Sequence, residues 1–216
     1  DYHEGQELKF TASATDPAGA NDTLTYDWVV TKDGVEYVTG SGPEITFMPD
    51  DDGIYSIELT VTDEDGGLTT LTYPGIDVSN VSPTLTIDGA ATVAEGATYT
   101  LNLSSSDPGT DTISKWTINW GDGTIEDIDG NPSSATHVYK DGPATYEISA
   151  TATDEDGTYD AQPATVTVTV ENVAPTVSLQ PVAAISENEV AELTGTITDP
   201  GDPETFTLTI AWGDGS

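Results

Sequence analysis

The feature that most limits how this chain can fold is an internal repeat of about 92 residues. Trp28, Trp120 and Trp212 are 92 residues apart each time, and several short motifs recur in the same register. Self-similarity at a fixed period indicates tandem copies of one structural unit. The recurring motifs are Glu4-Gly5, Glu95-Gly96 and Glu187-Asn188; Asp16-Pro17, Asp107-Pro108 and Asp199-Pro200; Asp63-Glu64-Asp65-Gly66 and Asp154-Glu155-Asp156-Gly157; and Asn80 to Pro83 and Asn172 to Pro175.

The register divides the chain into three repeats, 1–82, 83–174 and 175–216. The second is complete. The first lacks a counterpart of "PTLTID" (Pro83 to Asp88), its expected first strand, and the third holds only the N-terminal part of a repeat. We therefore expect the chain to be a segment of a longer array.

Within a repeat, apolar or small residues alternate with polar ones, as in 55–62, 146–153 and 165–170. This period of two is typical of half-buried strands, and no segment has the 3.6-residue period of a helix. About seven short strands per repeat, separated by Gly, Pro and Asp, predict a β-sandwich. The expected fold is all-β, with tandem immunoglobulin-like sandwiches and incomplete terminal repeats.

Two details favour immunoglobulin-like topology. The stretch Asp51 to Ile57 has the Asp-x-Gly-x-Tyr form of a tyrosine corner, centred on Tyr55. The recurring Trp lies on the expected third strand, where such sandwiches bury a Trp. We interpret the Trp series as core residues, with a sugar-stacking platform as the alternative.

The chain is strongly acidic: it has 4 Lys and 39 Asp plus Glu, and its formal net charge is −35. Nucleic acid and anionic membranes are excluded as partners because binding phosphate requires a basic surface. Two carboxylates about 4 Å apart repel by roughly 4 kcal/mol at an effective dielectric constant of 20. The composition therefore indicates bound cations, a high-salt habitat, or both. No apolar stretch is long enough to insert into a membrane, and there is no Cys.

Three stretches resemble a PKD domain: "NWGDGT" (119–124), "HVY" (137–139) and "ATYEISATATDEDG" (144–157). The third repeat begins in the same way, with "AWGDGS" (211–216). The first repeat reads "VVTKDG" after Trp28, without Gly-Asp-Gly or His-x-Tyr, and is more similar to a generic Ig-like or cadherin-like domain. The resemblance implies an extracellular, non-catalytic sandwich that acts as a spacer or contacts proteins and glycans.

The loops of such a sandwich alternate between its two ends, so acids of the first repeat should meet acids of the second. Ca²⁺ prefers six to eight carboxylate, amide or carbonyl oxygens. With no Cys and two His, a transition-metal site has little support. The expected Ca²⁺ ligands at this junction are Glu4, Asp50, Asp52, Asn80, Asp107, Asp154 and Asp156.

A second junction repeats this pattern between the second and third repeats, with Glu95, Asp122, Asp141, Asn172, Asp199 and Asp202. The residue types and their order are similar to those of cadherin junctions, where Glu, Asn and Asp residues hold Ca²⁺. Simpler interpretations remain open. Asp-Glu-Asp-Gly is also a hairpin turn, and Gly121-Asp122-Gly123 is also a tight turn.

We do not expect an enzyme. The acids recur with every repeat, whereas a catalytic pair would be unique to one cleft, and neither His3 nor His137 has a Ser or Cys partner in register. The predicted function is a Ca²⁺-stiffened stalk, fibre or adhesin, secreted or attached to the cell surface. Its expected partners are neighbouring repeats or like chains, and a host-cell, matrix or glycan ligand. The alternative is an accessory binding module of a secreted hydrolase.

Overall fold

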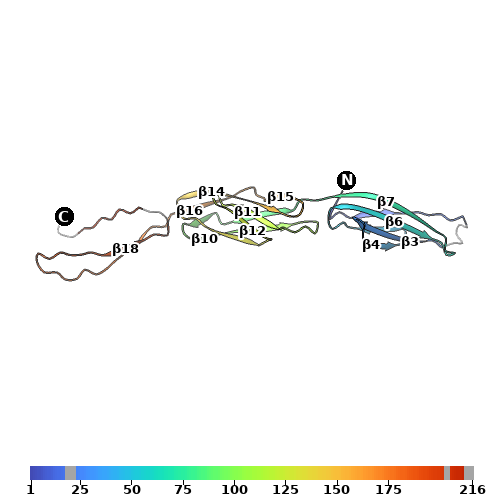
Figure 1. The fold of residues 1–216 in the computed structure, drawn as a ribbon. Helices are drawn as coiled ribbons and strands as arrows, with labels where there is room; N and C mark the ends of the chain where they lie inside the picture. Colours follow the sequence, from blue (N-terminus) through green and yellow to red (C-terminus); the bar gives the residue numbers. More distant parts are fainter. Residues whose placement is uncertain (18–22, 202–204, 212–216) are drawn as a thin grey trace. The chain divides into compact units, whose positions relative to one another are not determined.

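The computed structural model describes residues 1–17, 23–201 and 205–211 (Figure 1). The chain forms two compact units. Unit 1 comprises Asp1–Thr84, Ser105–Ile113 and Thr153–Tyr159, so it contains the first repeat together with two loops of the second. Unit 2 comprises Leu85–Ser104, Ser114–Ala152 and Asp160–Ser216. The regular elements of the described residues are strands, which confirms the all-β, immunoglobulin-like prediction.

The first repeat consists of a five-stranded sheet and a two-stranded sheet. The larger sheet has the order β1-β7-β6-β3-β4, with β1 parallel to β7, and the smaller sheet pairs β2 with β5. The strands are β1 (Tyr2–His3), β2 (Leu8–Thr11), β3 (Thr25–Lys32), β4 (Val35–Ser41), β5 (Glu44–Phe47), β6 (Gly53–Thr62) and β7 (Leu68–Ser79).

Both sheets contribute to one apolar core, as the alternating pattern requires. Leu8 and Phe47 of the smaller sheet pack in the same cluster as Trp28 and Ile57 of the larger one. The hydroxyl of Tyr55 donates a hydrogen bond to the backbone oxygen of Asp51 at 2.9 Å, which confirms the tyrosine corner.

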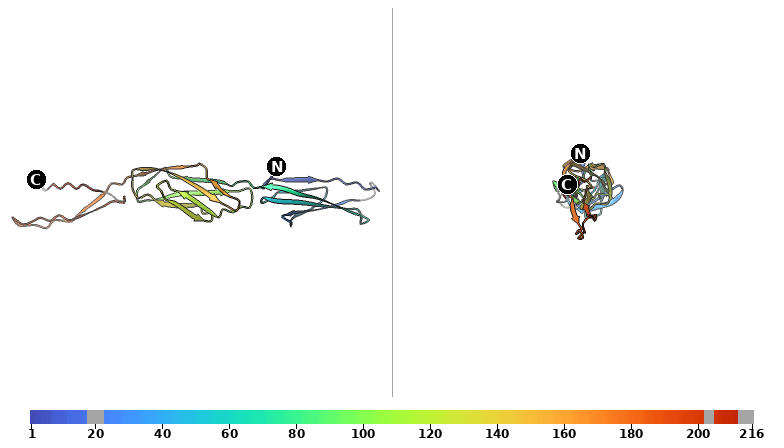
Figure 2. Two further views of the ribbon diagram at one scale, coloured as in Figure 1. Left: turned by 45° about the horizontal axis from the view of Figure 1, so that its top comes forward. Right: turned by 90° about the vertical axis from the view of Figure 1, so that its left-hand side faces the viewer.

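The second repeat is the green-to-orange part of the ribbon in Figure 2. It has a three-stranded sheet in the order β13-β10-β8 and a six-stranded sheet in the order β12-β11-β14-β16-β9, in which β15 also pairs with β14. Strand β9 is parallel to β16, as β1 is to β7. The strands are β8 (Thr84–Gly89), β9 (Thr92–Ala94), β10 (Thr98–Ser106), β11 (Lys115–Asn119), β12 (Ile125–Asp129), β13 (Ser134–Val138), β14 (Ala144–Thr153), β15 (Thr158–Asp160) and β16 (Val166–Glu171).

The core of this repeat contains Trp116, Ile118 and Trp120, which are fully buried. The Tyr139 hydroxyl donates to the Trp120 carbonyl at 2.9 Å. The interpretation of these Trp residues as core is therefore confirmed. Trp212, their counterpart in the third repeat, lies outside the described residues.

The beginning of the third repeat forms a two-stranded antiparallel sheet of β17 (Thr176–Leu179) and β18 (Gly195–Thr198). The alternating pattern predicts a strand through Leu208 and Ile210, but residues 205–211 form no strand and both side chains are exposed. In the described part of the chain, no helix is long and apolar enough to cross a membrane.

Candidate metal site

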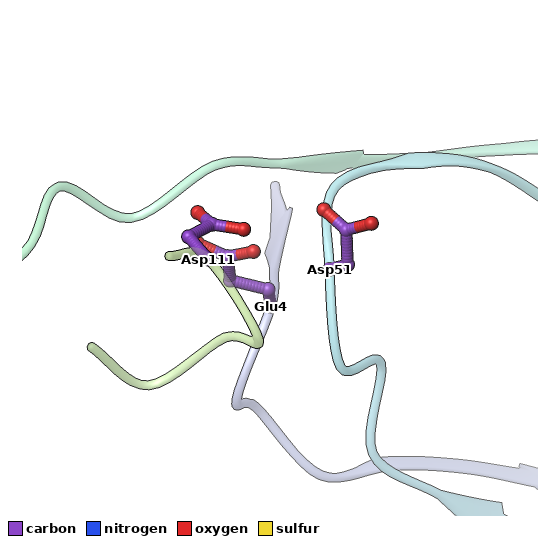
Figure 3. A group of neighbouring side chains, drawn as sticks. All are labelled: Glu4, Asp51 and Asp111. Carbon is purple, nitrogen blue, oxygen red and sulfur yellow. The ribbon is translucent and has the colours of Figure 1, made fainter. Parts of the chain in front are cut away.

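Three carboxylates from distant parts of the sequence come together in unit 1 (Figure 3). One oxygen each from Glu4, Asp51 and Asp111 lies within 4.8 Å of the others. Glu4 follows β1, Asp51 precedes β6, and Asp111 lies in the loop that follows β10. The first two belong to the first repeat and the third to the second.

Glu4 is buried, with 2% of its surface exposed. Its Oε1 accepts a hydrogen bond from the Val81 amide at 2.6 Å, whereas its buried Oε2 has no hydrogen-bond partner among the described residues. Burial raises the pKa of Glu4, the Val81 amide opposes that rise, and Asp107, Asp51 and Asp52 add to it. The site therefore holds a carboxylate whose charge is only partly compensated by the protein.

Asp111 is the most strongly perturbed carboxyl of the group. Burial, followed by repulsion from Glu4, Asp107, Asp156 and Asp51, raises its pKa to about 7. Its Oδ2 is buried and lacks a hydrogen-bond partner in the described structure. Each of these causes disfavours the ionised form, so a nearby cation would favour it.

Asp107 and Asp154 each use one oxygen to close a turn. Oδ1 of Asp107 accepts the Gly109 amide at 2.7 Å, and Oδ1 of Asp154 accepts the amides of Asp156 and Gly157 at 2.9 Å. The Oδ2 atom of each is buried and, within the described ranges, unpartnered. The turn expected at Asp-Glu-Asp-Gly is thus present, and it leaves one oxygen free for a ligand.

The first repeat contains the same hairpin in a different environment. Oδ1 of Asp63 accepts the amides of Asp65 and Gly67 at 3.0 and 2.8 Å, but these bonds lie at the exposed surface. Asp154, by contrast, is 7% exposed. The two copies of the motif therefore form the same turn, but only Asp154 is buried and has a buried oxygen without a partner among the described residues. The turn interpretation applies to both copies, and the cation interpretation applies to the copy at Asp154.

Gly5 and Gly109 lie where the Glu4-Gly5 segment and the Asp107-Pro108 segment come close to each other. A methyl group on Gly109 would lie 2.5 Å from Oε2 of Glu4 and 3.1 Å from Oδ1 of Asp107. Gly5 has φ of +68°, and a methyl group there would lie 2.7 Å from the Cβ of Pro108. The close approach that brings the carboxylates together requires a residue without a side chain.

The other predicted ligands of this junction lie around the three-carboxylate group. The backbone oxygen of Asp50 accepts the Thr110 amide at 2.7 Å. Asn80 Nδ2 donates to the Tyr159 hydroxyl at 3.5 Å. Burial raises the pKa of Asp52, and repulsion from Asp156 adds to that effect. Among the described acidic residues, the group within 4.8 Å contains Glu4, Asp51 and Asp111, and the predicted acids Asp50, Asp52, Asp107, Asp154 and Asp156 are not members of it.

Asp51 and Asp111 are the members that sequence reasoning missed. Asp51 lies between the two predicted acids Asp50 and Asp52, and it also forms an ion pair with Lys32. Asp111 belongs to "GTDT", which looks like a plain loop because the register aligns Asp111 with Pro203. Asp111 has no acidic counterpart at Pro203, so recurrence does not identify it.

Unit 2 repeats part of this arrangement. Glu95 is 1% exposed; its Oε1 accepts the Val173 amide and its Oε2 the Gly142 amide, both at 2.7 Å. Asp199 Oδ1 accepts the Gly201 amide at 2.8 Å, and its Oδ2 is buried without a partner among the described residues. Both oxygens of Glu95 are therefore engaged, in contrast to those of Glu4.

The remaining predicted ligands of the second junction have other surroundings. Asp122 lies 2.7 Å from Nε2 of His137 and accepts the Thr124 amide at 2.9 Å. Burial raises the pKa of Asp122, but the bonds from His137 and Thr124 outweigh burial and lower it. Asp141 and Asn172 are exposed, and Asp202 lies outside the described residues. The prediction that Asp122 joins Glu95 gains no support from these contacts.

Comparison with known protein families identifies the family of the chain. The model of the PKD domain family matches residues 1–73 and 80–170. The chain belongs to the PKD domain family. PKD domains are typically extracellular, non-catalytic modules. The first matched range covers the repeat without Gly-Asp-Gly and His-x-Tyr, so that repeat also lies within the PKD family match.

The solved structures that match this PKD chain have low sequence identity to it. No curated protein matches the chain. The amphioxus IgVJ-C2 molecule is 16% identical, with a TM-score of 0.42 over 78% of this chain and 99% of that one. The three N-terminal domains of the bacteriophage RB49 Highly Immunogenic Outer Capsid protein are 18% identical, with a TM-score of 0.33 over 93% of this chain and 67% of that one. The Bacteroides ovatus glucan-utilization protein SGBP-B, in complex with a mixed-linkage heptasaccharide, is 16% identical, with a TM-score of 0.28 over 88% of this chain and 47% of that one.

Proposed function

We propose that this PKD segment binds Ca²⁺ at Glu4, Asp51 and Asp111 and serves as a cation-stiffened, non-catalytic part of an extracellular stalk, fibre or adhesin. The observation that carries the proposal is the buried carboxylate of Glu4: its Oε2 has no hydrogen-bond partner in the described structure, and one of its oxygens lies within 4.8 Å of oxygens of Asp51 and Asp111. A buried charged oxygen is costly unless it is paired, and a cation supplies the pair.

The oxygen-only chemistry of the site favours Ca²⁺ over softer metals. Ca²⁺ accepts six to eight oxygens in an irregular geometry, whereas Mg²⁺ requires a near-octahedral arrangement and loses its water reluctantly. Besides the three carboxylates, the unpartnered Oδ2 atoms of Asp107 and Asp154 belong to the same unit. Together with backbone carbonyls and water, they could complete such a coordination shell.

A bound cation would stabilise the fold because it attracts the same carboxylates that repel one another in its absence. Without a cation, the raised pKa values of Glu4 and Asp111 show that ionisation is penalised. A ligand that binds the native state stabilises it by about 2.7 kcal/mol when its concentration is 100 times the Kd. The ionised site is therefore expected to be stable mainly in its cation-bound form.

The mechanical consequence follows from where the ligands lie in the sequence. Glu4 and Asp51 belong to the first repeat, while Asp111 belongs to a loop of the second. A cation bound by all three restrains that loop against the first repeat. Contacts between domains of one chain are normally small and permit motion, so this restraint would stiffen an array of repeats.

Thermal unfolding and limited proteolysis test the proposal. With Ca²⁺, we expect a higher Tm and slower cleavage in the segment from Asn80 to Pro83 than with a chelator. NaCl at matched ionic strength is the control, because a purely halophilic adaptation would respond to salt alone. If NaCl and Ca²⁺ protected the chain equally, specific cation binding would be contradicted.

A glycan-binding function is less well supported. Trp28, Trp116 and Trp120 are buried in the two cores and offer no stacking surface. We therefore propose the stalk function and not the accessory hydrolase module.

A further inference from the structure

Lys32 brings a positive charge to the three-carboxylate group. It is the last residue of β3, and its ammonium forms an ion pair with the carboxylate of Asp51, a member of that group. Lys9, the other lysine of unit 1, pairs with Glu44, which is not a member. The site therefore carries a counterion of its own before any cation binds.

The stem of Lys32 packs against the beginning of β6. Lys32 is paired with Tyr55 in the antiparallel ladder of β3 and β6. A methyl group on Gly53 would lie 3.1 Å from Cε of Lys32, so the stem passes close to that backbone. The Lys32 side chain is 21% exposed, against 53% for that of Lys9. Lys32 thus presents a partly buried ammonium in a fixed place, whereas the ammonium of Lys9 is solvated.

The acids around Lys32 keep its side chain charged. Burial lowers the pKa of Lys32, but the hydrogen bond and charge of Asp51, together with the charges of Asp50 and Asp33, outweigh burial and raise it. The ammonium acts on its neighbours in turn: burial raises the pKa of Asp52, and the charge of Lys32 opposes that rise. Lys32 therefore stays positive throughout the pH range in which the carboxylates ionise.

The charges of the group and of Lys32 together match a divalent cation. Glu4, Asp51 and Asp111 carry three negative charges when all three are ionised (Figure 3). The Lys32 ammonium adds one positive charge, so the net charge is −2, which one Ca²⁺ neutralises. A trivalent ion would leave one positive charge in excess at a partly buried place, and an unpaired buried charge is costly.

We propose that Lys32 is a tethered counterion that sets the charge selectivity of the site, limiting its affinity for cations and favouring divalent over trivalent ones. The inference rests on the proposed Ca²⁺ binding and adds a selectivity to it. Coulomb repulsion between the ammonium and a bound ion is proportional to the charge of the ion, so it is half as large again for a trivalent ion as for Ca²⁺. Without a cation, the same ammonium compensates part of the acidic charge and stabilises the ion-free fold.

Calorimetric titration of the full chain with Ca²⁺ and, separately, with Tb³⁺ tests the inference. Tb³⁺ serves as a trivalent probe that also prefers oxygen ligands, and about 0.5 M NaCl screens the exposed acids that would bind both ions weakly. Lys32→Met removes the charge and keeps an apolar stem. We expect it to bind Ca²⁺ about tenfold and Tb³⁺ about 30-fold more tightly than the unmodified chain, because the logarithms of the two increases should stand in the ratio of the ionic charges.

Three further variants separate the charge of Lys32 from its packing and from the overall charge. Lys32→Gln removes the same charge with a polar side chain and should show the same two increases, whereas Lys32→Arg keeps the charge and should show neither. Lys9→Met removes a positive charge from an exposed ion pair of the same unit and should change each affinity by less than about twofold. In chelator, Lys32→Met should lower the Tm because Asp51 loses its ion pair, and saturating Ca²⁺ should remove most of that difference.

The outcomes distinguish this inference from the proposed function. If the unmodified chain binds Ca²⁺ but Lys32→Met and Lys32→Gln leave both affinities unchanged, or raise that for Tb³⁺ no more than that for Ca²⁺, the inference is overturned and Ca²⁺ binding stands. If Lys9→Met raises both affinities as much as Lys32→Met does, the effect comes from overall charge and the inference is also wrong. If neither the unmodified chain nor any variant binds either ion, the proposed Ca²⁺ site is itself contradicted, and the inference with it.

Discussion

Glu4 and Asp111 each bury one carboxylate oxygen that has no hydrogen-bond partner among the described residues, and their carboxylates lie within 4.8 Å of each other. Two acids in this arrangement cannot both ionise at low cost without a counterion. Lys32 supplies one positive charge through its ion pair with Asp51, but Asp51 is itself a third acid of the group. The protein's own charges therefore leave the site negative when its acids are ionised.

Glu4→Gln should lower the Ca²⁺ affinity tenfold or more, as measured by calorimetry. The amide oxygen can still accept the Val81 amide, but the charge is lost. In chelator, the variant should unfold at the same temperature as the unmodified chain or higher, because a repelling charge has been removed. Glu58→Gln, at an exposed position of β6, is the control and should change neither quantity. Equal Ca²⁺ affinity in both variants would contradict the assignment.

Stability in chelator should fall as the pH rises from about 4 to about 7. The pKa of Asp111 is about 7 in the native state against an ordinary value of 3.8, so between these values the native chain holds a proton that the unfolded chain releases. Stability decreases with pH wherever the native state binds more protons. Asp111→Asn should make the pH dependence of Tm less steep.

Ca²⁺ should reverse this trend, because it binds the ionised carboxylates. The Tm increase caused by Ca²⁺ should be larger at pH 8 than at pH 5. An increase that is independent of pH would indicate that the cation binds elsewhere.

Asp154→Asn and Asp63→Asn should differ in their effect although both replace the first acid of the same hairpin. Asparagine retains an oxygen that can accept the turn amides, so neither variant should unfold the hairpin. Calorimetry should show weaker Ca²⁺ binding for Asp154→Asn, which loses a buried unpartnered oxygen, and no change for Asp63→Asn. If the two variants bound Ca²⁺ equally well, Asp154 would be a turn residue only.

Gly109→Ala should destabilise the chain by roughly 1–3 kcal/mol, as measured by denaturant unfolding. The added methyl group would lie 2.5 Å from Oε2 of Glu4 and force the two loops apart. Gly157→Ala is the control, since its methyl group would come no closer than 3.2 Å, to the Tyr159 hydroxyl. Equal stability of Gly109→Ala and the unmodified chain would show that the loops can separate freely.

Much of the fold follows from local sequence patterns. The period of two along β10 and β11 places Leu101, Leu103, Trp116 and Ile118 on buried faces, because successive side chains of a strand point to opposite sides. The tyrosine corner at Tyr55 is likewise a local motif, since its partner lies four residues away. The same alternation at Leu208 and Ile210 lies in the third repeat, of which the sequence holds only the N-terminal part, and residues 205–211 form no strand.

The site is harder to predict, because it depends on loops from different repeats. Glu4, Asp107 and Asp154 can be found from their recurrence, and all three are buried or have a buried oxygen. Asp111 does not recur, and only the position of its loop beside Glu4 identifies it. Asp122 stays a prediction: the described contact of its side chain is with His137 of β13, 15 residues away in the sequence, and this contact lends the expected pairing with Glu95 no support.

Crystallography of the chain grown with Ca²⁺, using anomalous scattering, tests the central claim most directly. The account predicts an anomalous peak about 2.3–2.6 Å from Oε2 of Glu4 and from carboxylate oxygens of Asp51 and Asp111. The absence of a peak at this position would contradict it, as would a peak found only at exposed acids such as those of the hairpin at Asp63.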